Sequence, residues 1–141
     1  MPELDDRTVA YILETRKPFE DLRQVAAQLA GLLVLEAAGA RSELPQHPML
    51  MAAEELYGDA AERVRMAHVT RRAGRHQHCL VEAAAAIRSA LDAAHRSPAI
   101  DPILAPLRAA YAQLQAASHE LPGFEMIVFE QGCCGPARRD R

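Results

Sequence analysis

Two short segments carry the histidine and cysteine side chains that are best suited to chemistry. His76, His78 and Cys79 lie close together in the sequence, and Cys133 and Cys134 are adjacent and flanked by glycines. Imidazole nitrogens and thiolates are preferred ligands of zinc, copper and iron, and exposed thiols also exchange disulfides. The two segments therefore raise the hypothesis of a metal- or redox-responsive site.

The metal hypothesis depends on how the chain turns at Gly74. If two helices fold back on each other there, His68 approaches the side chains of segment 76–79 from the preceding helix. Glu82, one helical turn beyond His78, would then supply a further ligand or a hydrogen-bond acceptor. If the second helix begins before residue 76 instead, the side chains of that segment point in different directions. The sequence leaves both arrangements open.

The cysteine pair and one glutamate are weaker candidates. Cys133 and Cys134 lack the two-residue spacing of the usual Cys-x-x-Cys motif, so an alternative interpretation is an incidental pair near the C-terminus. Glu36 falls on the apolar register of its helix, where burial would raise the pKa of a carboxyl group. Glu36 and His68 are the acid–base candidates if the protein is an enzyme.

Several common motifs are absent from the sequence. The Glu-x-x-His pairs of di-iron bundles, the Cys-x-x-Cys-His motif of covalent haem, the glycine-rich phosphate loop and the His-Glu-x-x-His zinc motif do not occur. The usual cofactors of helical bundles are therefore not indicated, and zinc, copper or iron at the candidate residues is the remaining cofactor hypothesis.

One stretch resembles a known family. Residues 67–74, Ala-His-Val-Thr-Arg-Arg-Ala-Gly, are locally similar to a histidine phosphotransfer domain, in which an exposed histidine on a helical hairpin accepts a phosphoryl group. The resemblance implies that His68 is the acceptor and that Arg71, three positions later, assists. Arg72 stands where the family usually has glycine, and Thr70 occupies a position that is usually hydrophobic.

The composition places the chain among ordinary globular proteins. It has 141 residues, of which 50% are hydrophobic but only 4% aromatic, so the core must consist of aliphatic residues and alanine. The net charge of −3 argues against general nucleic-acid binding. Three cysteines without a spaced framework favour a reducing, cytoplasmic location. The longest apolar run, 29–38, contains Glu36 and is too short to cross a membrane.

Apolar residues recur every three to four positions over most of the chain, which predicts an all-α, antiparallel four-helix bundle. In the first helix these positions are Val9, Ile12 and Leu13. Gly39 is suited to end a helix, and Pro48 to begin one. The expected helices are 6–16 and 18–38, separated by a break or kink at Pro18, followed by 48–72, 76–95 and 101–119. A single helix over 48–95 is the alternative to a turn at Gly74.

The segment 124–130, Phe-Glu-Met-Ile-Val-Phe-Glu, differs from the rest and is expected to be extended. A single strand cannot satisfy its own backbone groups, so we expect it to reach a second copy of the chain. This divides the chain into a helical domain, 1–123, and an arm with a tail, 124–141. The leading functional prediction is a non-catalytic, homodimeric interaction or accessory module. Metal or redox binding and phosphotransfer through His68 are the alternatives.

Overall fold

The computed structural model describes residues 3–39, 44–96 and 99–126. Within these residues there are four α-helices, and there is no strand: α1 (Asp6–Ala37), α2 (Pro48–Met66), α3 (Gly74–Arg96) and α4 (Asp101–Glu120). A short 3-10 turn, η1 (Leu44–Gln46), precedes α2. The prediction of an all-α, four-helix bundle is confirmed.

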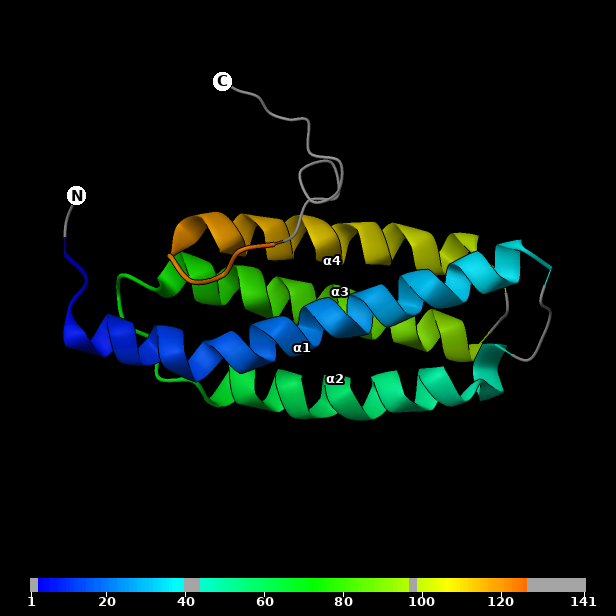
Figure 1. Ribbon diagram of the computed structural model, residues 1–141, viewed down its shortest axis with the longest axis horizontal. Helices are drawn as coiled ribbons and strands as arrows, with labels where there is room; N and C mark the ends of the chain where they lie inside the picture. Colours follow the sequence, from blue (N-terminus) through cyan, green and yellow to red (C-terminus); the bar gives the residue numbers. More distant parts are fainter. Residues whose placement is uncertain (1–2, 40–43, 97–98, 127–141) are drawn as a thin grey trace, which may run out of the picture.

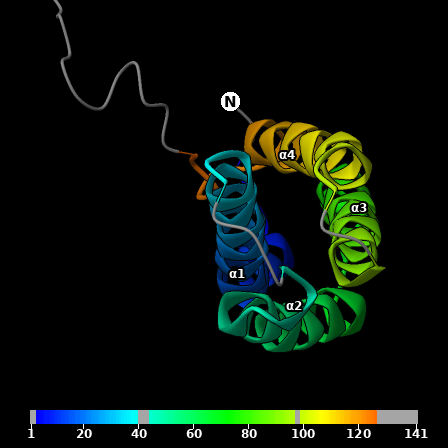
Figure 2. The same ribbon diagram turned by 90° about the vertical axis from the view of Figure 1, so that its right-hand side faces the viewer.

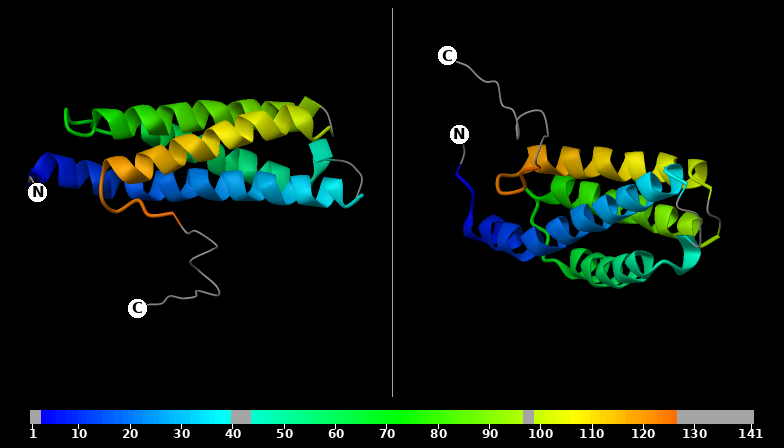
Figure 3. Two further views of the ribbon diagram at one scale, coloured as in Figure 1. Left: turned by 90° about the horizontal axis from the view of Figure 1, so that it is seen from above. Right: turned by 45° about the vertical axis from the view of Figure 1, so that its right-hand side comes forward.

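The helices run alternately up and down along the long axis of the molecule (Figure 1). Seen from one end, they follow one another around the bundle in the order of the chain (Figure 2). The most extensive packing occurs within two hairpins, α1 with α2 and α3 with α4, whereas the contact between α2 and α3 is smaller. The N-termini of α1 and α3 consequently lie at the same end of the bundle (Figures 1 and 3).

The helices form because their apolar residues share one face, which is covered by the other helices. In α3 and α4 the apolar residues spaced three to four apart are all buried: Leu80, Ala84, Ile87, Leu91 and Ala94 in α3, and Ile103, Leu107, Ala110, Leu114 and Ala117 in α4. Many of these residues are alanines, which allow the two helices to approach closely. The predicted helix boundaries also hold at Gly39, whose φ is +85°, and at Pro48, which begins α2.

Of the predicted break or kink at Pro18, the break does not occur, because α1 continues through this residue as one helix. Proline inside a helix removes one hydrogen bond and costs about 3 kcal/mol. The buried stripe nevertheless keeps the same register before and after Pro18, with Tyr11 and Ile12 on one side and Phe19 and Leu22 on the other. The stabilisation from burying this face along the whole helix outweighs the cost of the lost hydrogen bond.

The boundary between α2 and α3 also differs from the prediction. Helix α2 ends at Met66 instead of 72, because Ala67 is extended and the backbone N–H of His68 bonds to the carboxylate of Glu14. Helix α3 begins at Gly74, and the hydroxyl of Thr70 accepts a hydrogen bond from the N–H of Ala73 just before it. Residues 67–73 form the α2–α3 connection, so 48–95 is not one helix.

The chain returns to α1 after α4. Gly123 adopts a φ of +97° in the turn beyond α4, and the chain passes close to Ile12 there. Phe124 is then buried against Phe19. Residues 124–126 are neither helix nor strand, and the rest of the predicted arm, 127–130, lies outside the described residues.

No helix among the described residues combines the length and the apolar character that are needed to cross a bilayer.

Candidate functional site

A groove of about 730 Å³ lies between the N-terminal part of α1 and the α2–α3 connection. We call it the terminal groove. It is lined by Asp5, Arg7, Ala10, Tyr11, Glu14, His68, Val69, Thr70 and Arg71. Its walls therefore come from two segments that are far apart in the sequence but adjacent at one end of the bundle (Figure 3).

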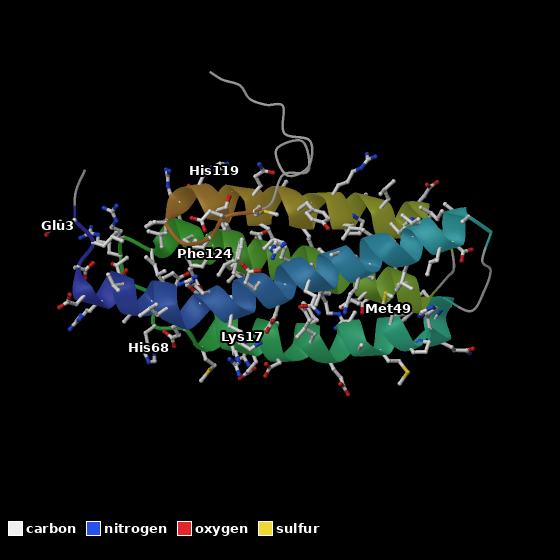
Figure 4. The ribbon with its side chains drawn as sticks, in the orientation of Figure 1. Glu3, Lys17, Met49, His68, His119 and Phe124 are labelled. Carbon is white, nitrogen blue, oxygen red and sulfur yellow. The ribbon has the colours of Figure 1, made fainter. Side chains whose placement is uncertain are left out.

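One wall of the terminal groove is fixed to α1 by a carboxylate. Glu14 accepts hydrogen bonds from the backbone N–H of His68, at 3.1 Å, and pairs with its Nδ1 atom at 3.2 Å. The imidazole itself remains 92% exposed and is at the surface of the bundle (Figure 4). Glu14 therefore orients the His68 ring while leaving its Nε2 atom open to solvent.

A chain of hydroxyl groups fixes the same connection nearer the N-terminus of α1. The Oγ1 atoms of Thr8 and Thr70 are 2.9 Å apart, and Thr8 donates to the carboxylate of Asp5. Since Thr8 has one proton, Thr70 must be the donor in the bond between the two threonines. The hydrogen bond from Thr8 lowers the pKa of Asp5, which is thus a stable anion at neutral pH.

The floor of the terminal groove is a buried polar network centred on Tyr11. The Nε2 atom of Gln77 donates to the carbonyl of Val64 at 2.8 Å, and the Tyr11 hydroxyl donates to Oε1 of Gln77 at 3.0 Å. The same hydroxyl is 2.8 Å from Nδ1 of His76. Its only proton is already donated to Gln77, so the imidazole must donate Nδ1–H to Tyr11.

Burial keeps the His76 ring uncharged, so with its proton on Nδ1 the free electron pair is on Nε2. This atom is buried and has no hydrogen-bond partner among the described residues. The ring packs against Phe124 at 4.1 Å between centroids and meets Tyr11 edge to face. Burial lowers the pKa of His76 to about 4 and raises that of Tyr11 above its usual range, so both groups stay uncharged at neutral pH.

The charged groups of the terminal groove fall into two kinds. Both carboxylates, Asp5 and Glu14, accept hydrogen bonds from the protein itself. Both guanidinium groups, Arg7 and Arg71, have no hydrogen-bond or ion-pair partner anywhere in the described part of the chain. The groove thus offers unused hydrogen-bond donors rather than unused acceptors.

The structure does not bring the predicted metal ligands together. His68 is exposed on the α2–α3 connection, and His76 is buried beside Tyr11. In the described ranges no group of three or more histidine, cysteine, aspartate or glutamate side chains is arranged to hold a metal ion. The side chains of segment 76–79 point in different directions because α3 begins before residue 76, which was the alternative arrangement.

The remaining ligand candidates line or flank a smaller, shallow groove. His78 is exposed and Cys79 half-buried beside Arg75 and Glu120, around a space of about 350 Å³. Burial, and then the negative charge of Glu120, raise the pKa of the Cys79 thiol, which lowers its reactivity. Glu82, one turn further along α3, is exposed. Metal binding at these residues stays a prediction.

Two other predicted residues take no part in the terminal groove. Cys133 and Cys134 lie outside the described residues. Glu36 is half-exposed near the C-terminal end of α1, at the opposite end of the bundle. It therefore lies far from the other candidates and from the buried network of His76.

The structure agrees only in part with the resemblance to a phosphotransfer domain. His68 is exposed, as expected, and Arg71 lines the same groove. However, His68 follows the end of α2 and lies on a connection instead of a helix. Phosphoryl transfer to His68 stays a prediction.

Tyr11 and Glu14, the α1 residues that build the site, were not among the residues expected from the sequence. Val9 and Leu13, two of the three positions expected to be apolar contacts of the first helix, are exposed at 40% and 64%. The buried face instead includes Tyr11 and two polar residues, Thr8 and Thr15. The sequence does contain a signal for this buried face. Its polar residues recur at helical spacing, and Phe19 and Leu22 continue the same face.

Comparison with known proteins gives no relative for this chain: no family model, no curated protein and no solved structure matches it.

Proposed function

We propose that this protein is a non-catalytic helical binding module and that its ligand occupies the terminal groove. The observation that carries this proposal is the groove itself, an open volume of about 730 Å³ that combines polar side chains with the apolar surface of Ala10 and Val69. Ligand sites are typically concave, with volumes of roughly 300–1,000 Å³, and combine apolar lining with a small number of placed polar groups.

The rigidity of the groove supports binding. Glu14 and Thr8 fix its second wall to α1, and Tyr11 joins its floor to α3 through His76 and Gln77. A site that is already formed loses little conformational entropy when a ligand enters, so more of the contact energy appears as affinity.

The state of the two nearby histidines favours binding over acid–base catalysis. His76 is neutral and buried, with no exposed surface through which a substrate could reach it. His68 is paired with Glu14 but lies in water, where an ion pair stabilises a charge by little. Catalysis usually depends on groups whose charge is controlled in a site that excludes water.

The proposal is tested by locating where small molecules bind to the full chain. Amide chemical shifts should be followed by NMR while a mixed set of small carboxylates, phosphates, amines and neutral aromatics is added. We expect the largest shifts in residues 7–14 and 68–71. Ala10→Trp should abolish them by filling the groove, whereas Ala27→Trp, at an exposed position on the same helix, should not. Binders that perturb other regions only, or no binders at all, would contradict the proposal.

We further propose that the module is a homodimer in which the segment after Met126 reaches the second copy. Two features of α1 support this: Val9 and Leu13 are exposed one helical turn apart, and the chain passes the neighbouring Ile12 at Gly123. In the proposed dimer the second copy would cover Val9 and Leu13.

Deletion of residues 127–141 tests the dimer without disturbing the bundle. A deletion starting at 122 would also remove Phe124, which is buried, and would therefore confuse association with folding. We expect light scattering to show a dimer for the full chain and a monomer for the shortened chain, both with the same helical circular-dichroism spectrum. A full chain that is monomeric at high concentration would rule the homodimer out.

A further inference from the structure

We propose that the terminal groove binds an organic phosphate monoester. Arg7 and Arg71 would hold the phosphate from opposite walls, and the apolar surface of Ala10 and Val69 would contact the organic part. This inference rests on the proposed function, since it names the chemical class of ligand for the same groove.

The hydrogen bonds already formed in the groove favour an anionic ligand. The two carboxylates of the groove already accept hydrogen bonds from His68, in the case of Glu14, and from Thr8, in the case of Asp5. Arg7 and Arg71 have no partner among the residues that the structure describes. A cation would therefore compete with existing bonds, whereas an anion would meet donors that are free.

The presence of two arginines favours phosphate over carboxylate. A guanidinium group binds either anion through two parallel hydrogen bonds. One such group occupies both oxygens of a carboxylate, so a second arginine would add little. A phosphate monoester has three free oxygens and carries about two negative charges at neutral pH, which matches two arginines.

The position of the two arginines also favours an anion. Arg7 belongs to the first turns of α1, and Arg71 to the connection that is fixed to α1 by Glu14 and Thr8. The N-termini of α1 and α3, which carry partial positive charge, lie at this end of the bundle (Figure 1). The α2–α3 connection also carries Arg72, which is exposed but does not line the groove.

The groove also has apolar surface for the organic part of the ligand. Ala10 and Val69 supply this surface next to the arginines. The groove is far larger than an inorganic phosphate ion requires. A monoester with an apolar or aromatic body would use both halves of the site.

Phenyl phosphate and benzoate make a suitable pair of probes, because they share a ring and differ in the anionic group. Binding to the full chain is measured by NMR titration at pH 7.5 in low salt. We expect phenyl phosphate to bind at residues 7–14 and 68–71, at least tenfold more tightly than benzoate or inorganic phosphate. Arg7→Gln and Arg71→Gln should each weaken it by about tenfold or more, as expected for a lost charged hydrogen bond. Arg72→Gln is the matched control and should change the affinity less than twofold.

The possible outcomes distinguish this inference from the proposed function. If benzoate binds as tightly as phenyl phosphate, the choice of phosphate is wrong but the groove remains a ligand site. If Arg7→Gln and Arg71→Gln leave the affinity unchanged, the arginines do not hold the anion and the inference fails. If only cationic or neutral molecules bind in a manner that Ala10→Trp blocks, the inference fails and the proposed function stands. If nothing binds in the groove, both fail.

Discussion

The Tyr11 hydroxyl lies 2.8 Å from Nδ1 of His76 and joins the first turns of α1 to the first turns of α3. The bond is buried, and the same hydroxyl donates to Gln77. One side chain therefore satisfies two partners on a helix that begins more than sixty residues later in the chain. It forms the floor of the terminal groove and links the two hairpins of the bundle.

Removal of this hydroxyl should destabilise the fold. Tyr11→Phe would leave the imidazole N–H of His76 and the amide oxygen of Gln77 without a buried partner, at a cost of about 1–3 kcal/mol each before relaxation. We expect the free energy of unfolding to fall by about 2–4 kcal/mol in urea denaturation, since both partners lose their bond. Tyr111→Phe is the control: Tyr111 is half-buried with no hydrogen bond from its hydroxyl in the described chain, so it should change little. Equal effects of the two substitutions would contradict the network.

Stability should depend on pH through His76. Burial lowers its pKa from 6.5 to about 4 in the folded protein. Between these values the unfolded chain binds a proton that the folded chain does not, so acid favours unfolding. The stability that the folded protein gains while His76 is uncharged is fully present above pH 6.5 and is lost as the pH falls to about 4. The difference in pKa corresponds to about 3 kcal/mol.

Two measurements check this pH dependence. The NMR signal of the His76 ring should not titrate between pH 7 and 5. His76→Phe should flatten the dependence of unfolding free energy on pH over the same interval, where most carboxylates are still ionised. His78→Phe, at the exposed position two residues later, should leave the slope unchanged. A normal titration of His76 near pH 6.5 would show that the ring is not buried as described.

Phe124 should contribute strongly to stability although it follows the last helix. Its ring is buried and packs against Phe19 at 5.2 Å and His76 at 4.1 Å between centroids. Phe124→Ala should therefore cost about 3–5 kcal/mol in chemical denaturation. Met51→Ala, at a residue that is 63% exposed, should change the unfolding free energy by less than about 0.5 kcal/mol. A small effect at Phe124 would mean that the segment after α4 does not pack on the bundle.

A cluster of charges connects α2 to α3, the pair of consecutive helices with the smaller contact. Arg88 pairs with Glu54 across the two helices, and also with Asp92, while its guanidinium lies over the ring of Tyr57. Hydrogen bonding from Arg88 is the main cause of the lowered pKa of Glu54. Because both partners are partly exposed, we expect a double-mutant cycle with Glu54→Gln and Arg88→Gln to give a coupling of about 1 kcal/mol that decreases with salt.

The control for this cycle is the pair Asp59–Arg63, which lies within α2 and is more exposed. The same type of cycle there should give a coupling of less than about 0.5 kcal/mol. A coupling between Glu54 and Arg88 no larger than this would mean that the charges do not stabilise the contact of α2 with α3.

The sequence determined the helices because the information is local. Apolar residues at a spacing of three to four fixed which face of each helix is buried, as in Leu80, Ile87 and Leu91 of α3. Gly39 and Pro48 marked boundaries through backbone conformations that depend on their own residue type. The same local rules failed at Pro18, where burial on both sides of the proline keeps the helix continuous.

Only the tertiary structure decided which side chains meet. Tyr11 and His76, Glu14 and His68, and Thr8 and Thr70 are each joined across more than fifty residues, and no spacing in the sequence encodes these pairs. His76 and His78 are close together in the sequence, but they point to different sides of α3. The ring of His76 is therefore buried and that of His78 is exposed. Which chemistry this chain can perform therefore depends on how its hairpins pack, because packing sets the distance between residues that the chain itself keeps apart.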